Sequence, residues 1–123
     1  MGHRFEHLSA EVIGAALAVH KDLGPGFLES IYHAAIRVAL EHRAIPFVSE
    51  LPVSIRFEGV VVGQSRIDLI VANQIVVELK AVEKLREVHF AQLKSYLRAS
   101  RLHIGLLMNF NAATLTIRRM VLH

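Results

Sequence analysis

Two short segments of the sequence carry charged side chains inside otherwise apolar runs. Asp68 lies within the apolar residues 67–71, and Glu78 and Lys80 lie within residues 75–81. Carboxylate and ammonium groups are rarely buried unless they are paired or bind an ion. Clustered carboxylates beside a basic group can hold a hard divalent cation and activate water for hydrolysis. These three residues are therefore the first candidates for a reactive site.

The second of these segments has the composition of a strand that is covered on both faces. Because side chains alternate along a strand, Glu78 and Lys80 should share one face, with Val77 and Leu79 on the other. An alternative stays open for this segment alone. Glu78 and Lys80 could be a neighbouring pair close to an exposed sheet edge.

The loop between the two segments decides whether the two acids meet. If residues 72–74 form a three-residue hairpin loop, Val71 pairs with Ile75 and Asp68 falls opposite Glu78. Paired side chains on one face lie ~4.5–5.5 Å apart at Cβ, and like charges there are destabilising. Lys80 could offset part of that repulsion, and a divalent cation explains the pair better. A loop one residue shorter would place the acids on opposite faces and remove the site.

The elements that position these residues follow from the spacing of apolar side chains. Spacings of three and four predict helices, whereas alternation predicts strands. Gly24-Pro25-Gly26 and Pro46 end the first two helices. The expected elements are helices 5–23 and 27–43, strands 53–59, 60–71 and 75–81, helix 83–99, and strands 102–109 and 114–121. The order α-α-β-β-β-α-β-β predicts one α/β domain, residues 1–123, with a mixed sheet.

The composition excludes several classes of protein. Of the 123 residues, 53% are hydrophobic and 20% charged, which fits a folded domain rather than a disordered chain. The absence of cysteine excludes disulfides and thiolate zinc sites, and it suits a cytoplasmic location. No apolar run reaches the ~18–20 residues of a membrane span and no signal peptide is recognised, so no membrane association is expected.

The basic residues give weaker information. The net charge is +3, which permits contact with phosphates without requiring it. A group of basic residues flanks the candidate site, and a solvated helix face would look the same. Its members are Lys80, Lys84, Arg86, Lys94, Arg98 and Arg101.

Asp68 followed by Glu78-Leu79-Lys80 resembles the signature of the PD-(D/E)XK nuclease superfamily, with Ile67 in place of the proline. Residues 26–32, Gly-Phe-Leu-Glu-Ser-Ile-Tyr, resemble the GxxExxY pattern of a small prokaryotic family assigned to that superfamily. Residues 105–110 are similar to that family's closing strand, so the resemblance covers essentially the whole chain. It implies a restriction-endonuclease-like fold and a nuclease activity.

By this resemblance, Glu29 would join Asp68 and Glu78 as an acidic member of the site. The alternative is that Glu29 stabilises the first turn of its own helix. Tyr32 is expected to pack in the core with its hydroxyl anchored nearby.

Gln92 and Tyr96 share one face of the third helix, with His89 on the same side. They fit a Gln-x-x-x-Tyr pair that the superfamily often uses to steady the lysine or contact the phosphate. A polar helix surface without function is the alternative. The eight histidines form no zinc-binding motif and are expected to be surface residues.

The resemblance implies hydrolysis of a phosphodiester. Asp68 and Glu78, with Glu29 and the carbonyl group of Leu79, would hold Mg²⁺ or Mn²⁺, and Lys80 would orient the attacking water or stabilise the developing charge. Two alternatives stay open: a nucleic-acid-binding or regulatory module that does not cut, and a structural salt-bridge network. The expected partner is nucleic acid, with DNA favoured over RNA, and homo-oligomerisation is left open.

Overall fold

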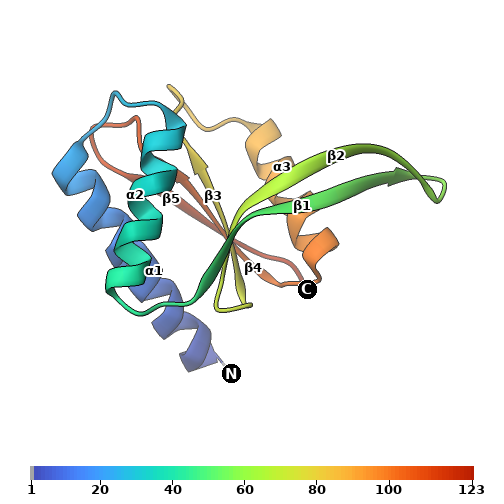
Figure 1. Ribbon diagram of the computed structural model, residues 1–123, viewed down its shortest axis with the longest axis horizontal. Coiled ribbons are helices and arrows are strands. Elements are labelled where there is room, and N and C mark those ends of the chain that lie inside the picture. The colour runs from blue at the N-terminus through green and yellow to red at the C-terminus, as the bar shows by residue number, and fades with distance from the viewer. Residues whose placement is uncertain (1) are drawn as a thin grey trace.

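The computed structural model describes residues 2–123, and their side chains from residue 6 onward. Its sheet has the strand order β1-β2-β3-β4-β5, with β3 and β4 parallel and all other neighbours antiparallel. Two helices cover one face and the third covers the other (Figure 1). The elements are α1 Gly2–Leu23, α2 Glu29–His42, β1 Phe47–Phe57, β2 Val60–Val71, β3 Ile75–Lys80, α3 Glu87–Ser100, β4 Ile104–Asn109 and β5 Thr116–Val121. The predicted α/β class and element order are confirmed.

Several predicted boundaries are wrong, by six residues at the start of β1 and by one to four residues elsewhere. β1 begins at Phe47 rather than residue 53, and it tolerates Pro52 because it is an edge strand. α2 begins at Glu29 rather than residue 27, since Leu28 is extended with ψ 151°. α3 begins at Glu87 rather than residue 83. There the extended Arg86 donates its backbone N–H to the His89 ring, 2.9 Å away, which fixes the helix start.

The sheet buries a separate hydrophobic core on each face. Leu69, Val77 and Leu79 pack against α1 and α2, whereas Val76 packs against α3. This division confirms the predicted alternation along β3. Close packing of α3 also requires Gly105 on β4, where an added Cβ would lie 2.7 Å from the Leu93 side chain.

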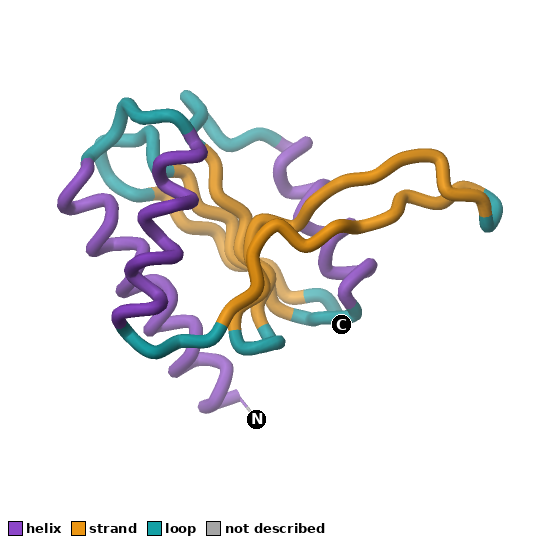
Figure 2. Tube along the Cα trace, viewed as in Figure 1, coloured by secondary structure: helices purple, strands orange, loops and turns teal. Residues whose placement is uncertain are grey.

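The outer halves of β1 and β2 leave the body of the molecule as a two-stranded arm, the long orange hairpin in Figure 2. At the base of this arm the β1–β2 register runs from Ser49↔Leu69 to Leu51↔Ile67, without a pair at Glu50 and Asp68. Glu50 has φ +54°, an uncommon conformation for a residue other than glycine. The strands therefore bend away from the sheet at Asp68.

Tyr32 fixes the loop that precedes α2. Its hydroxyl donates to the Gly24 carbonyl oxygen at 2.6 Å and accepts from the Phe27 N–H at 3.1 Å, and its ring stacks on Phe110. The side chain is fully buried, which confirms the predicted packing role. The tyrosine thereby orients the start of the helix that carries Glu29.

Removal of this hydroxyl should destabilise the protein. We expect Tyr32→Phe to lower the free energy of unfolding by about 1–2 kcal/mol, because the Phe27 N–H and the Gly24 carbonyl, in partly buried hydrogen bonds, lose their shared partner. Urea denaturation of both proteins measures the difference. Equal midpoints and equal slopes would show that the hydroxyl does not anchor the loop.

Candidate active site

The register between β2 and β3 is the one required for the two acids to meet. Val71 pairs with Ile75, Ile70 with Val76 and Leu69 with Val77, as the three-residue loop predicted. The turn closes through a hydrogen bond from the Gln74 N–H to the Val71 carbonyl oxygen, 2.9 Å long, with Ala72 and Asn73 at positive φ. Continuing the register by one residue places Asp68 opposite Glu78.

Where β2 separates from β3, the two carboxylates accept hydrogen bonds from backbone N–H groups in place of backbone carbonyl oxygens. Glu78 Oε2 accepts the backbone N–H of Asp68 at 2.7 Å. Asp68 Oδ2 accepts the backbone N–H of Leu79 at 2.8 Å. Each acid therefore satisfies an N–H that the separating strands would otherwise leave unpaired. This reciprocal pairing holds two carboxylates close together in a largely dry environment.

The environment makes Glu78 difficult to ionise. Burial raises the pKa of Glu78 to about 8, and the neighbouring Asp68 carboxylate contributes to the increase. The Asp68 N–H and the Lys80 ammonium group act in the opposite direction. Burial also raises the pKa of Asp68, while the Leu79 N–H opposes that change. A cation bound between the two acids would stabilise their ionised forms.

Lys80 extends from the same face of β3 toward α3. Its Nζ donates to Gln92 Oε1 at 2.9 Å, so the helix fixes the position of the ammonium group. Among the described side chains, no hydrogen bond joins Tyr96 to Lys80. Tyr96 is buried, and its hydroxyl forms a hydrogen bond with the Ser65 hydroxyl at the base of the arm. Of the predicted Gln-x-x-x-Tyr pair, Gln92 therefore contacts the lysine and Tyr96 contacts the arm.

The start of α2 lies close to the C-terminal end of β3 (Figure 1), and Glu29 is the first residue of α2. Glu29 lines a cavity of about 260 Å³ together with Asp68, His33, Ser30, Glu50 and Arg66. Burial raises the pKa of Glu29; Lys80 lowers it and Asp68 raises it, as expected for charges that face one another. No side-chain hydrogen bond caps the N-terminus of α2.

Sequence reasoning missed two further residues of this cavity and misjudged one histidine. His33 is buried rather than on the surface, and its Nε2 lies 3.2 Å from the Asp68 carbonyl oxygen. Its position one helical turn after Glu29 was the available signal. Glu50 and Arg66 come from the arm, and no sequence pattern marked them. Their placement depends on the bend of β1 and β2.

The carboxylate oxygens of the site suit a hard divalent cation, although the acidic side chains do not form a complete set of metal ligands. Asp68 and Glu78 offer carboxylate oxygens, which Mg²⁺ and Mn²⁺ prefer. Within residues 6–123, whose side chains the structure describes, no group of three or more His, Cys, Asp or Glu side chains is arranged to hold a metal ion. Glu29 lines the same cavity as Asp68 without completing such a group. The raised pKa of Glu78 indicates that its negative charge is poorly compensated by the protein, so a bound cation would favour the ionised form.

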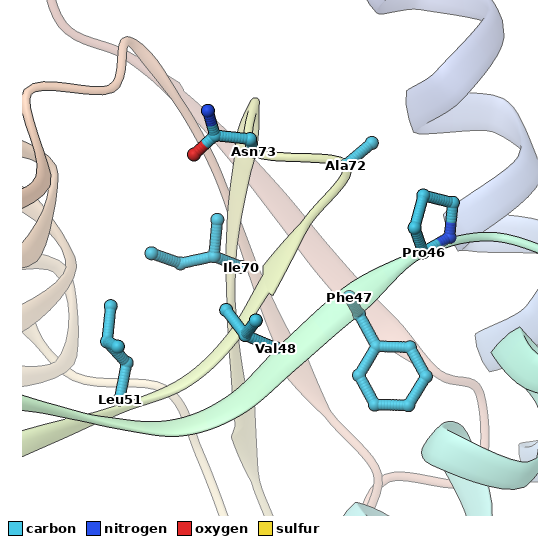
Figure 3. Close-up of a pocket in the computed structure, with 7 residues that line it drawn as sticks. All are labelled: Pro46, Phe47, Val48, Leu51, Ile70, Ala72 and Asn73. Carbon is cyan, nitrogen blue, oxygen red and sulfur yellow. The ribbon is translucent and has the colours of Figure 1, made fainter.

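A larger and more apolar cavity lies beneath the base of the arm, but it has no reactive groups. Its volume is about 610 Å³. The residues that line it are Pro46, Phe47, Val48, Leu51, Ile70, Ala72 and Asn73. Val48 and Ile70 point to one side of the strand pair, whereas the Phe47 ring points to the other (Figure 3). Because no ionisable side chain lines it, this cavity cannot supply acid, base or metal chemistry.

Comparison with known proteins agrees with the observed fold. A sequence model described as the PD-(D/E)XK nuclease superfamily matches residues 6–120. The mixed sheet and the element order are consistent with a restriction-endonuclease-like fold. No curated protein and no solved structure matches the chain. None of the helices in the described residues is both long and apolar enough to span a membrane.

Proposed function

The chain belongs to the PD-(D/E)XK nuclease superfamily, and we propose that it is a metal-dependent nuclease with Asp68, Glu78 and Lys80 as its catalytic residues. One observation carries the proposal: at a fork in the sheet, Glu78 accepts the Asp68 N–H and Asp68 accepts the Leu79 N–H, with a fixed lysine on the same face. A structural salt-bridge network would pair these carboxylates with cations, and no ion pair involves either of them among the described residues. We further propose membership of the GxxExxY family, which the sequence of residues 26–32 supports.

Each residue has a distinct role in this proposal. Asp68 and Glu78 hold a divalent cation, with the Leu79 carbonyl group and Glu29 as further oxygen ligands. When bound, Mg²⁺ or Mn²⁺ lowers the pKa of a water molecule and offsets charge on the phosphate. Lys80 orients the attacking water and stabilises negative charge as it develops, and Gln92 holds the ammonium group in place. The proposed substrate is nucleic acid, with DNA favoured over RNA.

A second function, nucleic-acid binding without cleavage, is favoured by the absence of a closed metal-binding group among the described side chains. In that case Glu78 would stay protonated near neutral pH, because its pKa is about 8. The Asp68–Glu78 pair would then be a hydrogen-bonded structural element at the fork. Metal-dependent activity distinguishes the two functions.

The direct test is cleavage of labelled single-stranded and duplex DNA and RNA with Mg²⁺, Mn²⁺ or EDTA. We expect cleavage with either metal ion and none with EDTA, because hydrolysis requires the activated water. Glu78→Gln, purified in the same way, should cut nothing and so controls for contaminating nuclease; Glu41→Gln, on an exposed part of α2 remote from the cavity, is its charge-matched control and should still cut. If no substrate is cut under any metal condition, the nuclease proposal fails, and binding of the same substrates in EDTA then distinguishes the binding function from a structural salt-bridge network.

A further inference from the structure

A separate cavity of about 350 Å³ lies beside the candidate active site, between β4, β5 and the segment that enters α3. The lining residues that matter below are Glu83, Lys84, Phe90, Asn109, Ala112 and Arg118. None of these residues has a role in the proposed catalysis. The cavity therefore calls for an explanation of its own.

The cavity opens on the same face of the sheet as Lys80. Lys80 pairs with Asn109 across the β3–β4 ladder, and the Phe110 N–H donates to the Lys80 carbonyl oxygen at 2.8 Å. Arg118 pairs with Leu107, whose side chain belongs to the core beneath α3. Lys80 and Lys84 are four positions apart in the chain, so their Cα atoms lie at most about 14 Å apart.

Two basic side chains in this cavity have no acidic partner. Among the described residues the only ion pair joins His7 and Glu11, so neither Lys84 nor Arg118 is neutralised, even by the nearby Glu83. Arg118 Nη1 donates to the Ile117 carbonyl oxygen at 3.1 Å, which leaves the other guanidinium donors free. Unpaired donors of this kind suit a phosphate group.

The walls of the cavity are held rigidly. The Asn109 side chain accepts the Val82 N–H at 3.1 Å and donates to the Val82 carbonyl oxygen at 2.8 Å, which ties β4 to the segment carrying Lys84. On the other wall, His20 Nε2 lies 2.8 Å from the Ala112 carbonyl oxygen. A preformed cavity binds with a smaller loss of conformational entropy than a flexible one.

Phe90 adds an aromatic surface to the two cations. Its half-buried side chain packs on the core beneath α3 and also lines the cavity. An aromatic ring beside basic groups is the combination that binds single-stranded nucleic acid, because every base can stack and every linkage carries a phosphate. A base inside a duplex is stacked and paired, and so it is not free to enter such a cavity.

We propose that this cavity binds an unpaired nucleotide of the substrate, with its base on Phe90 and its phosphate between Lys84 and Arg118. The proposal rests on the nuclease function proposed above and specifies its substrate class. The preferred substrate is a single strand or an unpaired end, and not an intact duplex.

The test measures binding in EDTA, where no cleavage occurs. The probe is a fluorescent single-stranded DNA of about 16 nucleotides, compared with the same strand in a blunt duplex. We expect wild type to prefer the single strand. Phe90→Leu and the double variant K84Q/R118Q should each weaken its binding about tenfold or more. The control K94Q/R98Q removes the same charge from exposed positions of α3 that do not line the cavity.

Two outcomes would overturn the proposal: equal affinity for single strand and duplex, or a K84Q/R118Q affinity no weaker than that of the control. In cleavage assays the cavity variants should raise KM and leave kcat unchanged. Failure of the nuclease proposal looks different. Wild type would then cut nothing, while its single-strand binding would still depend on Lys84, Phe90 and Arg118.

Discussion

Lys80→Gln should lower the rate of phosphodiester cleavage by about 10²–10³-fold, the usual effect of removing one group that stabilises transition-state charge. Glutamine is one bond shorter than lysine but keeps an N–H donor on the side of Gln92, which accepts the lysine hydrogen bond at 2.9 Å. The substitution therefore removes the positive charge with little change in packing. Single-turnover cleavage with saturating Mg²⁺ measures the chemical step without a contribution from product release.

The same variant separates chemistry from metal binding. Lys80 is not a metal ligand in the proposed mechanism, so Mg²⁺ should still raise the melting temperature of Lys80→Gln. Lys94→Gln, an exposed lysine of α3, is the matched control and should cut at the wild-type rate. Cleavage by Lys80→Gln within a few-fold of wild type would remove Lys80 from the catalytic group.

Glu78→Gln is expected to abolish the response to metal and to stabilise the metal-free protein. Glu78 is 2% exposed and its pKa is raised to about 8, from an ordinary value of 4.5, by burial and by Asp68. Its ionisation in the folded protein therefore opposes folding. A shift of this size corresponds to a free energy on the order of 3–5 kcal/mol. Glutamine keeps the side-chain volume and removes the charge.

The sign of the pH dependence follows from this shift. Between about pH 4.5 and 8 the folded protein binds the Glu78 proton and the unfolded chain does not, so stability falls as pH rises through this range. Below this range both states are protonated, and above it both are ionised, so the contribution is constant. Glu78→Gln should lack this component and should exceed wild type most clearly at pH 8.5.

Divalent metal should offset the loss of stability that wild type shows as pH rises, and it should leave the stability of Glu78→Gln unchanged. A metal ion binds the ionised carboxylates, so the gain in melting temperature should grow between pH 5.5 and 8.5. At a metal concentration 100 times the Kd the gain corresponds to about 2.7 kcal/mol. Thermal melts of wild type and Glu78→Gln, with Mg²⁺ or EDTA at each pH, measure both effects. A variant that melts below wild type, together with no metal response in either protein, would identify Glu78 as part of a structural network.

Features that depend on near neighbours in the chain could be read directly from the sequence. The alternation of β3 placed Glu78 and Lys80 on one face, and the three-residue loop set the pairing of Val71 with Ile75. Both follow from the two-residue period of a strand and from the length of one turn. Tyr32 was correctly assigned to packing, because an aromatic residue on the apolar face of a helix is buried whatever that helix contacts.

The bend in the sheet could not be predicted in this way. It results from the positive φ of Glu50 and from the separation of β2 from β3, where side chains replace backbone partners. Strand 53–59 was predicted too short for the same reason, since Pro52 and the bend interrupt the alternation. Neither effect has a periodic signature, because each depends on which strands lie next to one another.

The sequence by itself determined the order of the elements, the register of one hairpin and the identity of three charged residues on neighbouring strands. Only the tertiary structure decided that Gln92 holds Lys80, that Tyr96 contacts Ser65 instead, and that His33 lies against Asp68. These contacts join residues 12 to 35 positions apart in the chain. Local periodicity assigns a side chain to a face, whereas the packing of whole helices on the sheet selects the group that it meets there.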